Sequence, residues 1–504
     1  MWTRRNSKFN YKTTDNFYIF LTILFNQMFN TGYYPKLWEV ACVIPINKPG
    51  KPSNRADSYR PISLTSTLSK IYEQFIIKKI NNHCENYNVI PENQFGFMRL
   101  TSTLHALSKF KEDICLNLNN KIPTAACSLD IEKAFDRTWI EGLVFKMKYI
   151  FGFDDHICKI VFSFLTNREI FVKLGNTLSN KMTISAGLPQ GAVLSAKLFL
   201  IYHADFPPPP PTIFNQINRI HYADDVLLYL SSKNIPFIQT QMNKYLTIIN
   251  KYLFLWKSAI NNEKTSAIIF KGNYNTLDRK IQKQIKNFKL KINNNTVKNC
   301  VKLKYLGLTI TNRLSFIPHI DNIIKKATLT LLSLRPLITP NGVDKNIKIL
   351  CYKQLIRPII SYGFAIWSDI SSHQMERLRL FERKCIRACI NYKRQPGSKY
   401  HFSNDILYDE SSIERIDRFL VNNAIIYLKS TYSHHNSIIN NCGKFPIIHS
   451  LDSSYKFKPA HTLLHLSQAN RLYDKDNKLI YYHRPYNILR TEKIYNTNQN
   501  IIKY

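Results

Sequence analysis

The sequence predicts an α+β protein in which an antiparallel sheet precedes a helical second half. Residues 219–230 place two adjacent aspartates between apolar runs of Ile, Val, Leu and Tyr, which are residues that favour strands. Asp224 and Asp225 are therefore expected at the tight turn of a β-hairpin. From about residue 315 the apolar residues recur at helical spacing instead, so the second half is predicted to be helical.

Length and charge narrow the class of protein. The 504 residues suffice for two to four domains, and 70 Lys and Arg oppose 34 Asp and Glu, for a net charge of +36. This excess favours a polyanionic partner, nucleic acid first, because phosphate neutralisation drives affinity and aromatic side chains stack on bases. An Asn-, Ile- and Lys-rich composition of the kind that AT-rich coding DNA produces accounts for part of the excess.

Ten scattered cysteines contain no C-x-x-C pair, which argues against a zinc knuckle or a redox motif and favours a reducing compartment. Near the start, Arg4 and Arg5 precede the apolar run 17–25, which resembles part of a signal peptide. The run is too short to cross a bilayer and lacks a cleavage site, so we predict an amphipathic helix from near Asp15 to Gly32. We expect an intracellular protein of nucleus and cytoplasm that is neither secreted nor bound to a membrane.

The first third of the chain alternates strand and helix signals. Residues 38–46 form a strand-like run that ends in a basic turn, and residues 58–64 lead into a helix. The core stripe predicted for that helix consists of Leu68, Ile71, Tyr72, Phe75 and Ile76. The loop 94–99 then precedes a helix that begins near Ser102.

The middle of the chain contains the remaining strands. Residues 125–131 form a short strand that ends on a carboxylate, and the Gly/Pro loop 187–191 opens directly onto an apolar helix, 192–202. Five prolines, 207–211, are predicted to form a rigid exposed connector before the acidic hairpin. After a helix that ends near Trp256, residues 266–270 form another strand.

The last part of the chain is predicted to be helical. One apolar stripe consists of Ile320, Ile323, Ile324, Ala327 and Leu331, and a second, surrounded by arginines, consists of Leu378, Phe381, Cys385 and Cys389. One more helix is expected at 415–428. The last fifty residues, rich in Asn, Tyr and Lys, are expected to be loosely ordered.

The acidic hairpin needs a cation, because adjacent carboxylates repel each other unless a divalent ion neutralises them. Asp130 ends one strand, and Asp224 follows 94 residues later on the hairpin turn, so neighbouring strands could place these carboxylates side by side. Three carboxylates at one sheet edge can hold two Mg²⁺ ions roughly 3.5 to 4 Å apart, which activates a hydroxyl and stabilises a leaving pyrophosphate. Taken alone, Asp130 would be interpreted as an exposed acid.

In their order, these segments resemble the reverse transcriptase of non-LTR (LINE-type) retrotransposons, most closely the Jockey-like group. The resemblance covers about residues 35–400, and the segments that carry it are 43–51, 59–64, 94–97, 129–136, 187–191, 222–225, 264–265 and 305–307. It implies a right-hand polymerase with fingers, a palm sheet and a helical thumb. The implied regions are an N-terminal helical extension (1–34), fingers and palm (35–310), a thumb (311–400) and a partly disordered C-terminal region (401–504).

The resemblance implies catalytic and metal-binding roles for named residues. Asp130 and Asp224 would ligate two Mg²⁺ ions, for which Mn²⁺ is a possible substitute. Asp225 would be a weaker ligand or a support for the turn, and the backbone carbonyl of Ile131 would be an extra ligand. Lys264 would be a general acid that protonates pyrophosphate, although a lysine before a strand is commonplace.

It also implies a binding site for the incoming dNTP. Phe135 would be a steric gate against a ribose 2′-OH, with packing against the palm as the simpler alternative. Lys48 and Arg60 would grip the triphosphate; as isolated residues they are surface charges. Gln190 and Gly191 would touch the nascent base pair, where glycine permits close backbone approach.

Primer and template contacts are implied in two places. Tyr305, Leu306 and Gly307 would form the primer grip, and the basic helix around Arg383 would follow the backbone of the hybrid. The sequence departs from the family at Met98 and Thr101, where Arg and His are common, and in the length of its proline run. No endonuclease segment precedes the polymerase motifs, so a truncated copy or partial gene model is expected, and no acidic series indicates RNase H.

The leading functional prediction is an RNA-directed DNA polymerase that extends a DNA primer with dNTPs on an RNA template. The alternative is a catalytically inert relic or a co-opted RNA-binding protein with the same fold. A third possibility, an enzyme like a group II intron maturase, requires a splicing domain or HNH nuclease that the tail does not show. The sequence predicts neither the template RNA nor the oligomeric state.

Overall fold

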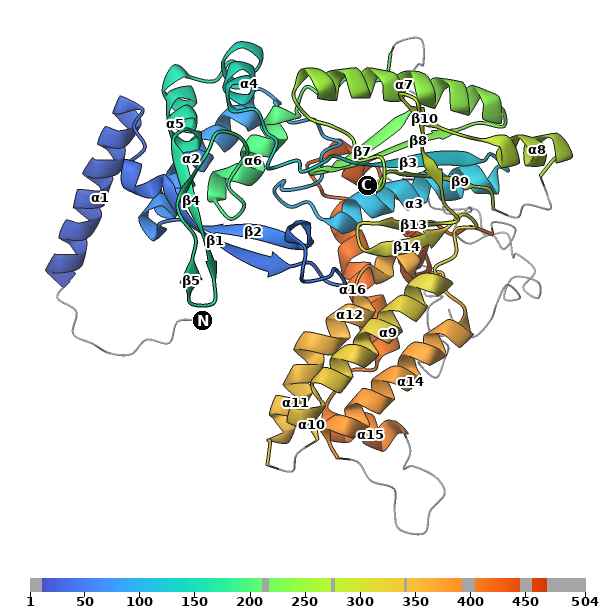
Figure 1. The fold of residues 1–504 in the computed structure, drawn as a ribbon. Coiled ribbons are helices and arrows are strands. Elements are labelled where there is room, and N and C mark those ends of the chain that lie inside the picture. Colours follow the sequence, from blue (N-terminus) through green and yellow to red (C-terminus); the bar gives the residue numbers. More distant parts are fainter. Residues whose placement is uncertain are drawn as a thin grey trace.

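The computed structural model describes residues 11–210, 217–272, 277–339, 342–391, 404–444 and 456–468. One five-stranded sheet lies beside a mixed strand-and-helix region that contains a second sheet, and a long helical region extends away from both, as Figure 1 shows. This arrangement confirms the predicted α+β class and matches the expected palm, fingers and thumb. Among the described helices, none is long and apolar enough to cross a membrane.

The palm sheet has the strand order β12-β9-β3-β8-β7. Its central strand, β3 (Thr124–Asp130), pairs antiparallel with β8 (Asp225–Ser231) and β9 (Ser266–Phe270). The edges are β7 (Asn218–Tyr222) and the short β12 (Lys298–Asn299). The strand predicted at 266–270 and the predicted hairpin are both confirmed.

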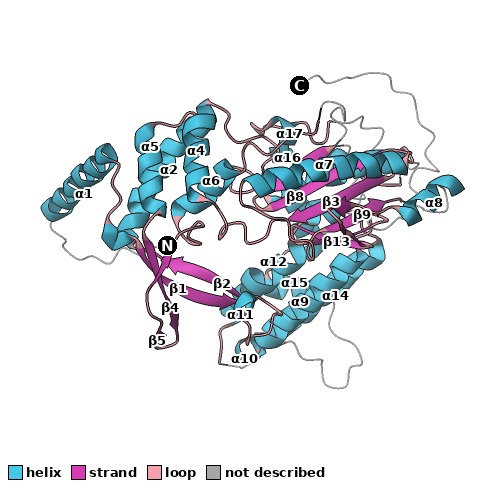
Figure 2. Ribbon diagram, turned by 45° about the horizontal axis from the view of Figure 1, so that its top comes forward, coloured by secondary structure: helices cyan, strands magenta, loops and turns pink. Residues whose placement is uncertain are grey.

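Both faces of the palm sheet are covered by helices, and Figure 2 shows α7 lying across one of them. On one face, α7 (Ile235–Leu255) and α6 (Val193–Tyr202) pack over Cys127. On the other, α3 (Thr103–Asn119) packs over Ala126. A strand buried on both faces favours a continuous apolar run over alternation, which accounts for the unbroken apolar sequence of β8.

The fingers combine a small sheet with helices. In the sheet, β1 (Val40–Asn47) pairs antiparallel with β2 (Tyr59–Leu64) and parallel with β4 (Arg168–Leu174). Its remaining members are β5 (Thr177–Leu178) and β6 (Met182–Ile184), and the surrounding helices are α2 (Thr67–Asn86), α4 (Ile140–Phe145), the π-helical turn η3 (Lys146–Ile150) and α5 (Asp155–Leu165). The N-terminal helix α1 (Tyr11–Thr31) packs on α5 and begins earlier than the predicted start near Asp15.

The core stripe predicted for α2 is partly wrong. Tyr72 and Ile76 are fully buried, but Leu68 and Ile71 are exposed. The buried face is instead rotated toward Ser69 and Glu73, two polar residues whose side chains hydrogen-bond to each other. Apolar periodicity could not indicate this face, because part of what α2 buries is polar.

The connector after α6 also differs from its prediction. The carbonyl of Pro207 accepts hydrogen bonds from Arg219 and Tyr245, so the proline run begins anchored to the sheet and to α7. Pro207 is half-buried rather than exposed. Pro211 lies outside the described residues.

Small elements join the palm to the thumb. They are α8 (Arg279–Asn287), β10 (Lys291–Ile292), β11 (Asn295–Thr296), β13 (Lys302–Tyr305) and β14 (Leu308–Thr311). The thumb itself consists of α9 (Ile317–Ser333), α10 (Arg335–Ile338), α11 (Lys345–Cys351), the π-helical turn η6 (Tyr352–Ile356), α12 (Arg357–Ser361), α13 (Phe364–Trp367) and α14 (Ser372–Cys389). Both predicted thumb stripes are buried in one core, except that Ile324 is only partly buried.

Helices beyond the thumb share this core. The described ones are α15 (Asn404–Ser411), α16 (Ile416–Thr431), α17 (Ser437–Asn440) and α19 (Thr462–Gln468). The α16 helix agrees with the one predicted at 415–428, and its Leu420 and Leu428 are buried with residues of α13 and α14. Residues 469–504, most of the tail expected to be loosely ordered, lie outside the described residues.

The face that α2 buries can be tested with two isoleucines of that helix. Ile76→Ala is expected to lower the free energy of unfolding by about 2–5 kcal/mol, because a fully buried side chain leaves a cavity. Ile71→Ala, on the exposed face, is expected to change it by about 0.5 kcal/mol or less. Urea unfolding followed by circular dichroism measures both; equal losses would contradict the assigned face.

Candidate active site

The palm sheet brings three aspartates to one edge. Asp130 at the end of β3 lies directly opposite Asp225 at the start of β8. The turn between β7 and β8 contains only Ala223 and Asp224, since Tyr222 pairs with Asp225. Ala223 adopts a φ of 56°, as tight two-residue hairpin turns require. The predicted convergence of neighbouring strands on one acidic edge is therefore observed.

The carboxylates at this edge repel one another. Burial raises the pKa of Asp225 to about 6, and the Asp224 and Asp130 carboxylates add to the rise. Burial also raises the pKa of Asp224, with Asp130 adding, while Lys264 and Arg60 act in the opposite direction. The edge therefore favours either protonation or a cation.

Lys264 supplies one cation. Its ammonium lies 3.1 Å from Asp130 Oδ2, and its side chain is 67% exposed. The turn that carries it is fixed to the strand, because the Asn261 amide donates to the carbonyl of Asp130 and the Asn261 side chain accepts from the Lys264 amide. The structure therefore places Lys264, the predicted general acid, in contact with Asp130.

The donor set suits a hard divalent ion. Mg²⁺ is usually held by one or two carboxylates, with waters and substrate phosphates completing its shell. Within the described ranges, no three His, Cys, Asp or Glu side chains are gathered closely enough to form a metal site by themselves. The aspartate edge thus fits an ion that arrives with phosphate oxygens. Ile131, beside Asp130, forms a backbone bridge with Ile260.

A loop from far upstream supports the aspartate turn. The Gln94 side-chain oxygen accepts from the amide of Gly96 at 2.8 Å and from that of Ala223 at 3.0 Å. The Phe95 amide donates to the carbonyl of His221. A Cβ on Gly96 would lie 2.3 Å from the nitrogen of Ala223. In the sequence, this loop was recognisable only as one of the segments that carry the family resemblance. Its composition gave no indication that it holds the aspartate turn.

The fingers hairpin directs cations toward the site. Arg60 lies on β2 opposite Ile46, is exposed, and is close enough to Asp224 to lower the pKa of that carboxyl. Lys48 follows β1, and its ammonium donates to the carbonyl of Asp57 at 2.8 Å. Of the two predicted phosphate-binding residues, Arg60 is close enough to interact with the charge of Asp224. Lys48 is instead bonded to the end of its own hairpin.

Phe135 lies on an aromatic support. Its ring stacks on Phe199, with centroids 4.8 Å apart and planes at 18°, and meets the edge of Phe97 at 6.4 Å. The side chain is half-buried. Packing therefore holds one face of the ring, while part of the residue is open to solvent.

Gln190 and Gly191 lie just before α6. The Gln190 side-chain amide donates to Asp136 Oδ1 at 3.0 Å, and the Gln190 carbonyl accepts from the Ser63 amide at 2.7 Å. Gly191 has a φ of +117°, and a Cβ there would lie 2.8 Å from the carbonyl oxygen of Ser63. The close approach that requires glycine is thus made to strand β2 of the fingers.

Sequence reasoning missed Glu73. This fully buried carboxylate accepts from the backbone amides of Val193 and Leu194, the first residues of α6, at 2.7 and 3.2 Å, and from Ser69 Oγ. A carboxylate at a helix N-terminus satisfies free amides and complements the helix dipole. The available signal was the i,i+4 pair of Ser69 and Glu73 beside the apolar residues of α2.

The residues predicted to contact the primer and the hybrid lie in two different parts of the structure. Tyr305 ends β13, and Leu306 and Gly307, with φ of 42° and 84°, form the turn to β14. Arg383 lies on α14, where its guanidinium pairs with Glu376 and its side chain is 14% exposed. The structure therefore does not present Arg383 as a free cation.

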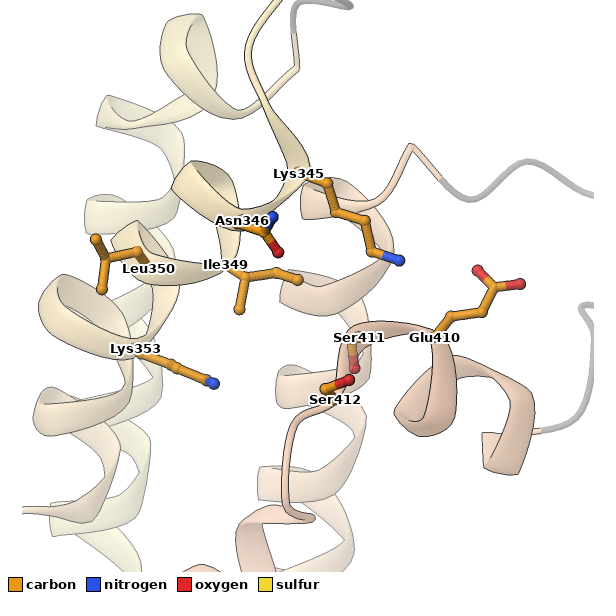
Figure 3. A pocket seen from close by; sticks show the side chains of 8 residues that line it. All are labelled: Lys345, Asn346, Ile349, Leu350, Lys353, Glu410, Ser411 and Ser412. Carbon is orange, nitrogen blue, oxygen red and sulfur yellow. The ribbon is translucent and has the colours of Figure 1, made fainter.

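The two departures from the family pattern have local roles. Thr101 donates its hydroxyl proton within its own loop, toward the carbonyls of Phe95 and Met98, and Met98 packs against the core of fingers and palm. Elsewhere, a pocket of about 280 Å³ lies between Lys345 and Lys353 of the thumb and residues 410–412 at the end of α15 (Figure 3). None of the aspartates lines it.

Substitution of Gly96 tests the support of the aspartate turn. Gly96→Ala is expected to push the loop away from Ala223, because the new Cβ would overlap backbone that cannot move independently. Faster hydrogen–deuterium exchange across residues 218–231 would record the change. Gly342→Ala, where a Cβ meets nothing within 4 Å, is the matched control. Unchanged exchange in Gly96→Ala would contradict the proposed contact.

The raised pKa of Asp225 predicts a pH-dependent stability in the absence of divalent ions. The pKa of this carboxyl is about 3.9 in the unfolded chain and about 6 in the folded protein. The folded protein thus holds the proton more tightly, and wild type loses stability as the pH rises between these values. Asp225→Asn cannot lose this proton. Its stability relative to wild type is expected to increase from pH 4 to 6 and then level off in urea titrations; parallel curves would contradict the shift.

Comparison with known proteins identifies the family. Residues 46–310, more than half of the chain, match the family described as reverse transcriptase (RNA-dependent DNA polymerase). The RNA-directed DNA polymerase from mobile element jockey of Drosophila melanogaster is 27% identical over 435 residues, which cover 86% of this chain and 46% of that protein. The probable RNA-directed DNA polymerase from transposon BS of the same organism is 28% identical over 404 residues, or 79% of this chain and 43% of that protein.

The chain thus spans less than half the length of these relatives. Among solved structures, telomerase from Candida albicans, determined with a fragment of telomeric RNA, is similar over 85% of this chain and 71% of that chain, with a TM-score of 0.37 and 14% identity. The assignment therefore depends on the sequence matches, which confirm the resemblance to non-LTR elements of the Jockey type. The chain belongs to the reverse transcriptase family.

Proposed function

We propose that this chain is an RNA-directed DNA polymerase, a nucleotidyltransferase that joins dNTPs to the 3′-OH of a DNA primer on an RNA template. The observation that carries the proposal is the register of the palm sheet, which places Asp130 opposite Asp225 beside Asp224. Family membership supports it, as do the names of the matched relatives. The net charge of +36 suits nucleic-acid partners.

The aspartate edge is the proposed reaction centre. Asp130, Asp224 and Asp225, with the carbonyl of Ile131, would hold Mg²⁺ or Mn²⁺, which when bound activates the primer hydroxyl and stabilises the departing pyrophosphate. Lys264, whose ammonium lies 3.1 Å from Asp130, carries a proton that it can deliver to pyrophosphate.

The surrounding residues bind and select the nucleotide. Arg60 and Lys48 neutralise the triphosphate from the fingers hairpin. Phe135, supported by the ring of Phe199, occupies the space that a ribose 2′-OH would need, and so favours dNTPs. Gln190 and Gly191 would lie against the nascent base pair, held in place through β2 and α6.

The nucleic acid would pass between palm and thumb. Leu306 and Gly307 contact the primer in this proposal, while Tyr305, which is buried, holds their turn from within the core. Arg383 can bind the backbone of the hybrid only by exchanging its ion pair with Glu376. We further propose that the protein works inside the cell, in cytoplasm and nucleus, where RNA template and chromosomal DNA occur.

One observation favours a second candidate, an RNA-binding protein without turnover. Lys264 neutralises Asp130 directly, and the three aspartates of this described edge are not gathered into a closed metal site. A chain of this kind would still bind nucleic acid through its charge. The two candidates differ in whether bound primer is extended.

Primer extension on poly(rA)/oligo(dT) with Mg²⁺ and dTTP separates the two candidates. Wild type is expected to incorporate nucleotide, and Asp224→Ala to lose at least about 10³-fold in rate, since the carboxylate acts on charge that develops in the reaction. Asp155→Ala, which removes an exposed carboxylate of α5, is the control and should extend normally. Folded wild type that binds the duplex without incorporation would overturn the polymerase proposal in favour of the second candidate.

A further inference from the structure

Tyr362 joins three separate parts of the molecule through one hydroxyl group. It follows α12 in the thumb and lies outside the eight segments that carry the family resemblance. Its hydroxyl lies 2.8 Å from the carbonyl oxygen of Leu306 and 2.9 Å from Thr103 Oγ1, at the start of α3. A phenol has one proton, and the carbonyl can only accept it, so the Thr103 hydroxyl must donate to Tyr362.

The Tyr362 ring packs on the same turn as its hydroxyl. A Cβ on Gly307 would lie 2.9 Å from Tyr362 Cε1, so this glycine is required by the ring as well as by its φ of +84°. Tyr362 is thus in contact with both central residues of the turn between β13 and β14, with Gly307 through its ring and with Leu306 through its hydroxyl. Any movement of the turn must move Tyr362 too.

The thumb holds Tyr362 from behind. The indole N–H of Trp367 donates to the Tyr362 carbonyl at 2.9 Å, and Trp367 is fully buried. At Gly363, with a φ of +73°, a Cβ would lie 2.9 Å from a methyl group of Leu308. The backbone of the thumb therefore crosses β14 at close range, which fixes Tyr362 to the thumb core.

Tyr362 is linked to the aspartate hairpin through α3. Its hydroxyl partner, Thr103, begins α3, and this helix packs against β7, the first strand of the hairpin. Tyr362 remains 39% exposed despite these contacts. Its side chain therefore connects the turn assigned to the primer, by way of α3, with the strand that leads to the aspartates.

We propose that Tyr362 is a positioning residue that sets the Leu306–Gly307 turn against the aspartate hairpin and so helps this turn to hold the primer strand. This inference rests on the proposed polymerase function, because only a polymerase would bind a primer at this turn. The hydroxyl transmits the position of the thumb and of α3 to the turn. Its loss weakens the hold on the primer–template and leaves the nucleotide site intact.

The test uses three full-length variants: Tyr362→Phe, Thr103→Val and the double variant. Tyr362→Phe retains the ring and loses both hydrogen bonds, so its KM for poly(rA)/oligo(dT) is expected to rise about 5-fold with kcat and the KM for dTTP unchanged. Thr103→Val loses one bond, and we expect a rise of about 2-fold. The double variant should equal Tyr362→Phe, because Thr103 has nothing left to donate to.

Several outcomes are decisive. Tyr149→Phe, at an exposed tyrosine of η3, controls for the substitution itself and should match wild type. Additive effects of the two substitutions, or an unchanged KM for primer–template in folded Tyr362→Phe, would overturn the positioning role. If wild type extends no primer, the proposed function fails separately. In that case, fluorescence anisotropy of a labelled RNA–DNA hybrid tests whether the Tyr362 and Thr103 variants bind the hybrid more weakly than wild type.

Discussion

The pairing of Asp130 with Asp225 across β3 and β8 is the constraint on which the rest of the site depends. One antiparallel register places these carboxylates opposite each other and leaves Ala223 and Asp224 as the whole turn. A shift by one residue would send every side chain of β8 to the other face of the sheet. The apolar residues that alternate between the two cores therefore fix the geometry of the acidic edge as well.

A site with this much repulsion has to be held together from outside. Gln94 fixes the turn by bonding the amide of Ala223, and Lys264 offsets the charge of Asp130. Each belongs to a loop that is far from its partner in the sequence but in direct contact with it in the structure. Because an unpaired buried amide is costly, the buried bond from Ala223 to Gln94 restrains the turn more firmly than the exposed ammonium of Lys264 restrains Asp130.

The same principle recurs farther from the aspartates. Glu73 binds the first amides of α6 and so holds the end of the loop that carries Gln190 and Gly191. Tyr362 does the equivalent for the turn at Leu306 and Gly307 from the thumb. Single polar side chains, buried or half-buried, thus connect the fingers and the thumb with the palm edge between them.

The sequence by itself determined the central palm strands, several of the long helices and the chemistry of the edge. Strand formers around Asp224 and Asp225 predicted the hairpin, and the strand that ends at Asp130 was recognisable from its small apolar residues. Helical periodicity predicted the buried stripes of α9 and α14. These features depend on local spacing, which a single chain displays directly.

Only the tertiary structure decided the polar contacts and the faces they occupy. Leu68 and Ile71 fit the apolar pattern of α2 yet are exposed, because Ser69 and Glu73 turn toward α6 instead. Arg383 lies on a basic helix that was predicted to follow the hybrid, yet its guanidinium pairs with Glu376. Gln94 and Ala223 are 129 residues apart, and Tyr362 and Thr103 are 259 apart. Hydrogen bonds over such separations depend on how the elements pack, and no local pattern in the chain records that packing.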